Sequence, residues 1–222
     1  MSLASEPAEP AQPPAGDDGP ADDDLMIALQ AGDADAFPAL IGRYQSRLIG
    51  FFTHNIKDRT LAEDLTQETF LKLHKAAWDY LPTGHFRAWL FRIARNLLID
   101  TTRKQSRDLL LHATKAKPAG EDAFDPLTAV SGDTPAPGLR ADQREVRDIV
   151  DDLLAGLPDE QRLTFTLHHD GGMSLPEVAE ELGTSLPTTK SRLRLAREKL
   201  RAALRPLGLD PHDEGKNARA EG

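Results

Sequence analysis

Carboxylate, amide and apolar side chains share a helix that the sequence predicts over residues 61–76. At helical spacing, Leu65 and Leu73 fall on an apolar stripe of this helix. The other stripe holds Asp64, Gln67, Glu68 and Leu71. These groups suit binding, and a leucine among polar groups is typical of a face that docks another protein. An ordinary solvated face with one stray leucine is the alternative.

Cations gather on one side of the next predicted helix, over residues 86–107. Its apolar residues, among them Phe86, Leu90, Ile93 and Leu97, recur at steps of three and four and therefore predict a buried face. The reverse side holds cations and an amide: Arg87, Arg92, Arg95, Asn96, Arg103, Lys104 and Arg107. A surface of this kind attracts an anionic partner such as nucleic acid.

A loop over residues 78–85 joins these two helices, because proline and glycine break the helical pattern there. An aromatic ring beside a basic helix can stack an unpaired base, which contributes about 1–3 kcal/mol per base. We expect Tyr80 and His85 to take part in such binding. Trp89 lies on the apolar stripe and is expected to close the core.

Residues 174–204 have the pattern of a helix-turn-helix. Ser174 and Glu177 have the spacing of a capping box, and Gly183 separates this helix from a second one that Ser185 can cap. The exposed side of the second helix carries Thr188, Ser191 and Leu195, flanked by Lys190, Arg192 and Arg194. This arrangement fits duplex DNA, since cations reach phosphates while the residues between them meet base edges.

His168, His169 and Asp170 form the one cluster that resembles a metal site. Adjacent residues in a helix point about 100° apart, and no further ligand stands nearby in the sequence. We therefore predict a solvated helix end before Gly171, with no metal and no cofactor.

The composition predicts an all-α protein of two small helical domains joined by a flexible linker, the second domain being the helix-turn-helix. Hydrophobic residues make up 39% of the 222 residues and aromatic ones only 5%, which favours small helical units. The expected parts are a disordered acidic tail (1–23), a first helical domain (24–107), a linker (108–143), the helix-turn-helix domain (144–205) and a polar tail (206–222). Because the chain has no cysteine and no apolar run long enough to span a bilayer, we expect a cytoplasmic protein.

Charge is distributed unevenly along the chain. A net charge of −9 argues at first against a nucleic-acid partner. Residues 1–24 hold seven acids and no Lys or Arg, whereas residues 190–205 hold seven cations against one acid. The two basic helices thus belong to an acidic chain, and we expect the N-terminal acids to compete with DNA for them.

The two central helices resemble the promoter-melting domain of the extracytoplasmic-function (ECF) sigma factors, the small initiation factors of bacterial RNA polymerase. Residues 62–70 (AEDLTQETF) and 86–100 (FRAWLFRIARNLLID) carry this resemblance, and residues 157–195 are similar to the family's −35-reading domain. It implies core RNA polymerase binding by Asp64, Gln67, Glu68 and Leu71. It implies −10 DNA binding by Asp79, Tyr80, His85, Arg92, Arg95, Asn96 and Arg103. It implies −35 DNA binding by Thr188, Lys190, Ser191, Arg192, Arg194 and Leu195.

The resemblance also implies promoter DNA and an anti-sigma factor as partners, with no membrane insertion and no bond chemistry by the chain itself. Three stretches depart from the family pattern. Thr53-His54-Asn55 is more polar than usual, residues 186–189 differ, and Leu195 stands where arginine is common. We expect Leu195 to pack on a thymine methyl group and to shift the −35 preference.

Two other functions are weighed against this one. A free-standing helix-turn-helix regulator would bind an operator without polymerase, ordinarily as a dimer, and no dimerisation helix is evident. An enzyme would need convergent carboxylates or a nucleophile with its base, which the sequence lacks.

Overall fold

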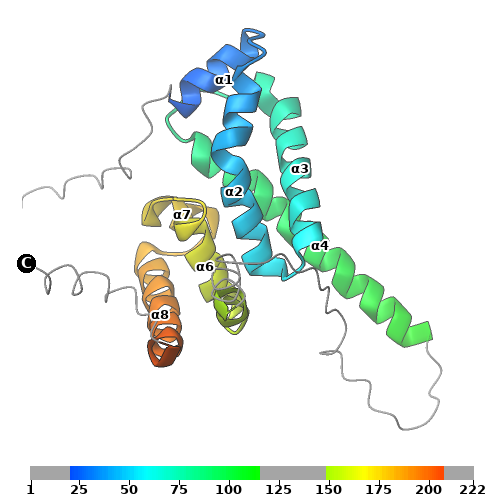
Figure 1. The fold of residues 1–222 in the computed structure, drawn as a ribbon, viewed down its shortest axis with the longest axis vertical. Helices are drawn as coiled ribbons and strands as arrows, with labels where there is room; N and C mark the ends of the chain where they lie inside the picture. The colour runs from blue at the N-terminus through cyan, green and yellow to red at the C-terminus, as the bar shows by residue number, and fades with distance from the viewer. Residues whose placement is uncertain (1–20, 116–148, 208–222) are drawn as a thin grey trace, which may run out of the picture.

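Every regular element in the described part of the chain, residues 21–115 and 149–207 of the computed structural model, is helical (Figure 1). The first half contains α1 (Asp22–Gln30), α2 (Ala36–Ile56), α3 (Arg59–Ala76), the 3₁₀ turn η1 (Ala77–Asp79) and α4 (Phe86–Lys115). The second half contains helical residues 149–155, α6 (Asp159–His169), α7 (Leu175–Glu181), α8 (Leu186–Leu204) and the 3₁₀ turn η2 (Arg205–Leu207). The predicted all-α class is confirmed.

The apolar stripes of α2, α3 and α4 meet in one core. Lys57 ends α2 in the left-handed conformation (φ 60°), and the Asp58 carboxylate caps α3 by accepting a hydrogen bond from the Leu61 amide at 3.0 Å. The stripes expected to be buried are buried, including Leu65, Leu73, Phe86, Leu90 and Leu97. Phe51 of α2 meets Phe91 of α4 edge to face, with ring centroids 5.6 Å apart.

The first helix begins at Asp22, two residues before the expected start at Asp24. The Asp22 carboxylate accepts hydrogen bonds from the Arg43 guanidinium and from the Tyr44 hydroxyl. Burial and this hydrogen bond to Asp22 raise the pKa of Tyr44. Asp22 is therefore a structural residue of the first half and not part of an acidic tail.

Helix α4 continues to Lys115, past residue 107, where the first domain was expected to end. Its last turns include residues 108–115, which were expected to belong to the linker. The rest of that segment, residues 116–143, and the expected tails over residues 1–20 and 208–222 lie outside the described residues.

The helix-turn-helix forms as predicted from α7 and α8. Ser174 and Glu177 make the capping box: the Glu177 carboxylate accepts from the Ser174 amide at 2.8 Å, and the Ser174 hydroxyl accepts from the Glu177 amide. Gly183 turns the chain with φ +60°, and the Ser185 hydroxyl accepts from the Thr188 amide. A small core of Leu154, Leu157 and Ala196 joins α8 to the helices before it.

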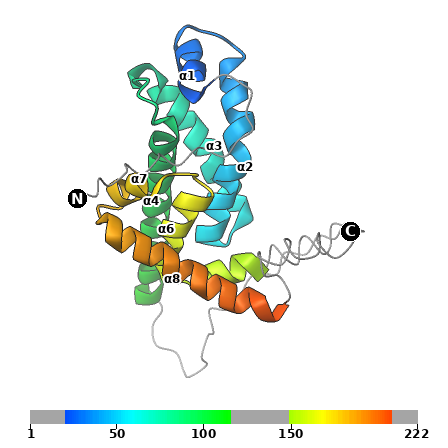
Figure 2. The same ribbon diagram turned by 90° about the vertical axis from the view of Figure 1, so that its left-hand side faces the viewer.

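The two halves lie side by side (Figure 2), and buried side chains of both halves form one core. Helix α6 contacts α2, and α7 contacts α4. Leu167, Met173 and Val178 of the second half are buried in the same cluster as the core of α1–α4. Gly171 permits this approach, since a Cβ atom there would lie 3.2 Å from a ring carbon of Phe91 and 2.4 Å from the Leu167 carbonyl oxygen.

The end of α6 lies at this boundary, so the expectation of a solvated helix end holds for His169, whose side chain is 68% exposed, and was wrong for Asp170. The Asp170 side chain is only 9% exposed and pairs with both His169 and His54. None of the helices in the described ranges is long and apolar enough to cross a membrane.

Candidate polymerase and nucleic-acid interfaces

The polar stripe of α3 is exposed along its whole length. Asp64, Gln67, Glu68 and Leu71 all face solvent, and Leu71 is 59% exposed. Beside them a groove of about 630 Å³ runs between α2 and α3, with Phe37, Ile41, Ile49 and Phe70 in its walls. Sequence periodicity marked α2 as amphipathic but gave no sign of a groove, because a groove depends on how two helices pack.

The residues of α4 that were predicted to bind DNA divide into two groups. Asn96 and Arg103 are exposed, and Arg103 makes no ion pair with any of the described residues. Arg92 Nε donates to Glu181 Oε2 at 2.8 Å, and Arg95 Nη1 donates to Glu181 Oε1 at 3.3 Å. The Glu181 side chain is only 4% exposed, and its hydrogen bond raises the pKa of Arg92. Two residues expected to contact DNA are therefore bound to α7.

Tyr80 is a core residue, so the expectation that its ring is available to a base was wrong. Its side chain is packed against Phe86 and Trp89, and the residue is 6% exposed. Burial and the hydrogen bond that its hydroxyl donates to Asp23 raise the pKa of Tyr80. Of the rings of Trp78 and Tyr80, only that of Trp78 is exposed, and this residue is 68% exposed.

The other loop residues line a second cavity, of about 350 Å³, between the two halves. Asp79 and His85 are exposed and lie in its wall with Arg92. The opposite wall comes from α7 and carries Glu177, Glu180 and Glu181. His85 Nδ1 lies 3.2 Å from Glu177 Oε1, so the loop is tied to α7 as well.

The exposed side of α8 presents most of the predicted residues. Thr188, Lys190, Ser191 and Arg194 are exposed, and Leu195 is partly buried. Arg194 pairs with Glu198 one turn later on the same helix, at 2.6 Å. Arg192 instead pairs with Glu160 of α6, and its side chain is only 20% exposed. Arg192 therefore braces α8 against α6 rather than standing free beside the exposed line.

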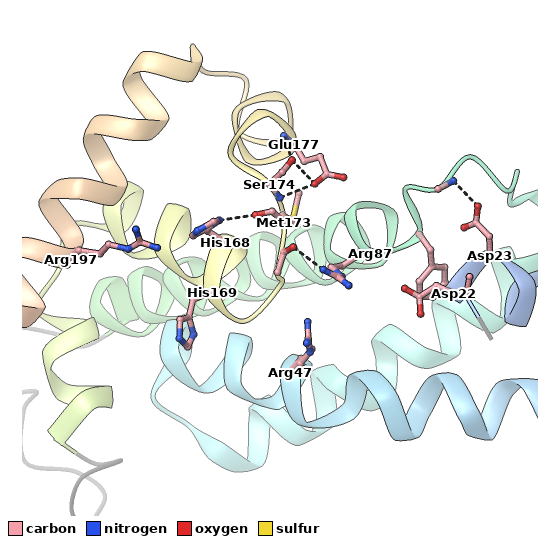
Figure 3. A pocket seen from close by; sticks show the side chains of 14 residues that line it. Asp22, Asp23, Arg47, Arg87, His168, His169, Met173, Ser174, Glu177 and Arg197 are labelled. Carbon is pink, nitrogen blue, oxygen red and sulfur yellow. Dashed lines mark hydrogen bonds between the residues drawn. The ribbon is translucent and has the colours of Figure 1, made fainter. Parts of the chain in front are cut away.

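A third cavity, of about 800 Å³, lies where α1, α2 and α4 meet the α6–α7 loop and α8 (Figure 3). Arg47 and Arg87 converge there on Gly172: Arg87 Nη1 donates to the Gly172 carbonyl at 3.0 Å, and a Cβ on Gly172 would lie 3.0 Å from Arg47 Nη1. The next residue, Met173, is buried in the core that the two halves share. No sequence signal predicted this cavity, because it forms only when both halves come together.

Within residues 21–115 and 149–207, no three or more His, Asp or Glu side chains are grouped so that they could hold a metal ion. The exposed surfaces described here differ in their chemistry: α3 has an acidic and apolar face, α4 has a cationic face, and α8 has a polar and cationic line.

Comparison with known proteins divides the chain into the same two halves. Residues 40–108 match the family model of sigma-70 region 2, and residues 147–200 match that of sigma-70 region 4. The chain is 31% identical over 185 residues to the ECF RNA polymerase sigma factor SigK of Mycobacterium ulcerans, covering 81% of this chain and 91% of SigK. It is 29% identical over 179 residues to SigW of Bacillus subtilis, covering 81% of this chain and 94% of SigW.

Solved structures give the same result. CnrH, determined in complex with the cytosolic domain of CnrY, aligns with a TM-score of 0.58 and 28% identity over 84% of this chain and 99% of that one. The sigma factor RpoE of Bartonella quintana, determined with the anti-sigma factor NepR, aligns with a TM-score of 0.57 and 25% identity over 76% of this chain and 96% of that one. The chain belongs to the ECF family of RNA polymerase sigma factors.

Proposed function

We propose that this sigma factor docks core RNA polymerase through Asp64, Gln67, Glu68 and Leu71 on α3. The opposite side of α3 is fixed in the core, so the four side chains form a rigid surface. Their combination of carboxylates, an amide and a leucine fits a basic partner surface with an apolar spot. The neighbouring groove between α2 and α3 adds apolar area to this docking surface.

The −10 strand is proposed to bind across α4 and the preceding loop. Arg92, Arg95, Asn96 and Arg103 supply phosphate and base contacts, and Asp79 and His85 border the cavity at one end of this face. Trp78 replaces Tyr80 as the ring that can stack an unpaired base, because only Trp78 is exposed. Melting then follows from preferential binding of the single strand, and the chain itself makes and breaks no covalent bond.

The −35 element is proposed to bind along α8. Thr188, Ser191 and Leu195 meet base edges, while Lys190 and Arg194 reach the flanking phosphates. Arg192 contributes mainly by holding α8 on α6, given its ion pair with Glu160.

An anti-sigma factor is proposed as a further partner. The structurally similar sigma factor RpoE of Bartonella quintana was determined in complex with the anti-sigma factor NepR, and the similar protein CnrH was determined with the cytosolic domain of CnrY. The surfaces available for capture are the same docking and DNA-binding faces, so a protein that covers them competes with polymerase and promoter.

The observation that carries this proposal is the exposed α3 stripe on a helix whose other side is buried. The test is transcription from a promoter library by core polymerase with the wild type and with Asp64→Ala plus Gln67→Ala. We expect the pair to abolish most specific initiation. Asp33→Ala plus Gln105→Ala removes the same two side-chain types from exposed positions of the first half outside α3 and is the matched control. Equal transcription from the α3 variant and the control would contradict the docking surface.

A further inference from the structure

The cavity of about 800 Å³ between the two halves gathers arginines from three helices (Figure 3). Arg47 comes from α2, Arg87 from α4 and Arg197 from α8. In the close view, Arg47 points toward Arg87, and Arg197 extends from α8 toward His168. Side chains of both halves therefore converge on one space, and the promoter and polymerase contacts proposed above do not use it.

Two of these guanidinium groups lie close together. Nη1 of Arg47 and Nη1 of Arg87 are 3.0 Å and 2.9 Å from the same point, the position that a Cβ on Gly172 would take. The two nitrogens are therefore at most about 6 Å apart, and like charges at this distance repel each other. One phosphate oxygen can accept from both, because each hydrogen bond spans about 2.9 Å. A bound anion would replace this repulsion by attraction.

The acids in the wall of the cavity are bound to other groups. The Asp22 carboxylate accepts hydrogen bonds from two side chains of α2, and the Asp23 carboxylate accepts from the Gly84 amide at 2.6 Å. Glu177 accepts from the amide of Ser174 at 2.8 Å and from its hydroxyl at 2.7 Å. Each of these acids therefore binds donors of its own and leaves the arginines of the cavity to another anion.

Arg47 and Arg197, by contrast, have no acidic partner in the described part of the chain. Neither makes a hydrogen bond or an ion pair with any other residue of the ranges 21–115 and 149–207. Arg47 is half-buried, so its charge has lost part of its hydration without gaining a carboxylate. Arginine presents a fork of N–H donors that matches phosphate, so two such arginines beside one cavity favour a phosphate-bearing ligand.

His168 offers a different contact at the Arg197 end of the cavity. Its Nδ1 lies 2.8 Å from the Met173 carbonyl oxygen, and a carbonyl can only accept, so Nδ1 carries a proton. In the neutral ring Nε2 is then an acceptor that can bind a hydroxyl group. The volume of about 800 Å³ falls within the range of small-molecule sites, about 300–1,000 Å³, and exceeds what an inorganic phosphate ion fills.

We propose that this cavity binds a small sugar phosphate with two phosphate groups, the class to which nucleoside diphosphates belong. Arg47, Arg87 and Arg197 hold the phosphates, and His168 accepts from a sugar hydroxyl. The proposal does not depend on the DNA-binding and polymerase-binding roles proposed above. Because the ligand contacts residues of both halves, it binds the native protein alone and raises its resistance to unfolding.

The test uses the full chain and titration calorimetry at low salt, with ADP, inorganic pyrophosphate and adenosine as probes. We expect ADP and pyrophosphate to bind at one site per chain and to raise the midpoint of thermal unfolding. Adenosine, which has no phosphate, should do neither. ADP should bind more tightly than pyrophosphate, because only ADP brings hydroxyl groups to His168. Absence of binding by both phosphate compounds up to about 5 mM would overturn the site, and equal affinity for the two would overturn the sugar contact.

Arg47→Gln plus Arg197→Gln removes one of these cations from each half. The affinity for ADP and for pyrophosphate should fall at least about tenfold, since charge-assisted hydrogen bonds to both side chains are lost. Arg107→Gln plus Arg201→Gln is the matched control. It removes two exposed arginines, again one from each half, that have no ion-pair partner in the described ranges. This control should bind both compounds as the wild type does.

Arg197→Gln alone changes only an exposed side chain and so tests the site without disturbing the core. It should weaken the binding of both compounds while the circular dichroism stays that of the wild type. Wild-type affinity in the variant lacking Arg47 and Arg197, or an equal loss in the control, would overturn the proposal. These measurements involve neither DNA nor polymerase, so their outcome is separate from the transcription test of the proposed function.

Discussion

Nδ1 of His54 lies 2.8 Å from Oδ2 of Asp170, which ties the last turn of α2 to the residue that follows α6. Asp151, also bonded to His54, and His169, bonded to Asp170, face the same site, and Lys57 pairs with Asp152 beside it. The boundary between the halves is therefore a group of alternating charges as well as an apolar contact.

The contact between the two halves at His54 and Asp170 should be sensitive to acid. Burial alone would raise the pKa of Asp170, but the hydrogen bonds with His169 and His54 outweigh burial and lower its pKa below the ordinary value of about 3.9. A carboxylate with a lowered folded-state pKa contributes stability above about pH 4 and loses it as the pH falls through the lowered value. Energy transfer between a dye on each half, attached at Thr60→Cys and Ala202→Cys, should therefore decrease as the pH falls below about 4.

Asp170→Asn is the matched variant for this pH dependence. It should show weaker transfer already at neutral pH and no acid transition of its own, with circular dichroism recorded in parallel to detect unfolding. An acid transition identical to the wild type would show that another group controls the boundary.

Tyr80 and Trp78 should separate stability from DNA binding. Tyr80→Ala leaves a cavity in the core and is expected to lower the free energy of unfolding by about 3–5 kcal/mol. Trp78→Ala removes an exposed ring and should change stability by less than about 0.5 kcal/mol. For promoter opening we expect Trp78→Ala to have the larger direct effect, because loss of a stacking ring costs about 1–3 kcal/mol of single-strand binding. Urea unfolding and permanganate reactivity of the −10 thymines measure the two effects; wild-type promoter opening by Trp78→Ala would remove Trp78 from the DNA face.

Leu195→Arg should change promoter choice. An apolar side chain can contact a thymine methyl group, whereas arginine prefers guanine, and such contacts discriminate by about 1–3 kcal/mol. Transcription from a library randomised at the −35 element should show the shift at one position. An unchanged promoter profile would dispose of this assignment, and Lys199→Ala, on the same helix but off the predicted line, serves as control.

Removal of residues 1–20 should strengthen unaided DNA binding at low salt. These residues contain four acids, Glu6, Glu9, Asp17 and Asp18, and no Lys or Arg. Their competition with phosphate is screened over about 10 Å at 0.1 M salt, so the gain should vanish as salt rises. The deletion retains Asp22 and Asp23, because these two residues anchor α1 and the loop before α4. Equal low-salt affinity of the full chain and the shortened one would refute the competition.

Local signals in the sequence were sufficient for the helices and their caps. The stripe of Leu65 and Leu73 follows from periodicity alone, and the caps at Ser174 and Ser185 depend on residues three positions away. The exposed stripe of α3 could be predicted for the same reason, since it is the reverse of a buried stripe on one helix.

The features that could not be predicted depend on contacts between residues that are far apart in the sequence. Tyr80 was predicted to bind a base because its partner Asp23 is 57 positions away in the sequence. Asp23 itself belonged to the segment that was expected to be a disordered tail. His54 and Asp170 are 116 positions apart, and Arg92 and Glu181 are 89 apart. No periodicity links such pairs, so the boundary between the halves emerges only from the three-dimensional arrangement.

Charge reversal on the exposed stripe of α3 tests most directly whether this helix binds core polymerase. Affinity for core polymerase should be measured with the wild type, with Asp64→Lys plus Glu68→Lys, and with Asp33→Lys plus Asp35→Lys as a control of equal charge change on exposed residues elsewhere in the first half. We expect loss of polymerase binding and of transcription for the α3 variant alone, with helicity retained. Wild-type affinity for polymerase in the α3 variant would contradict it.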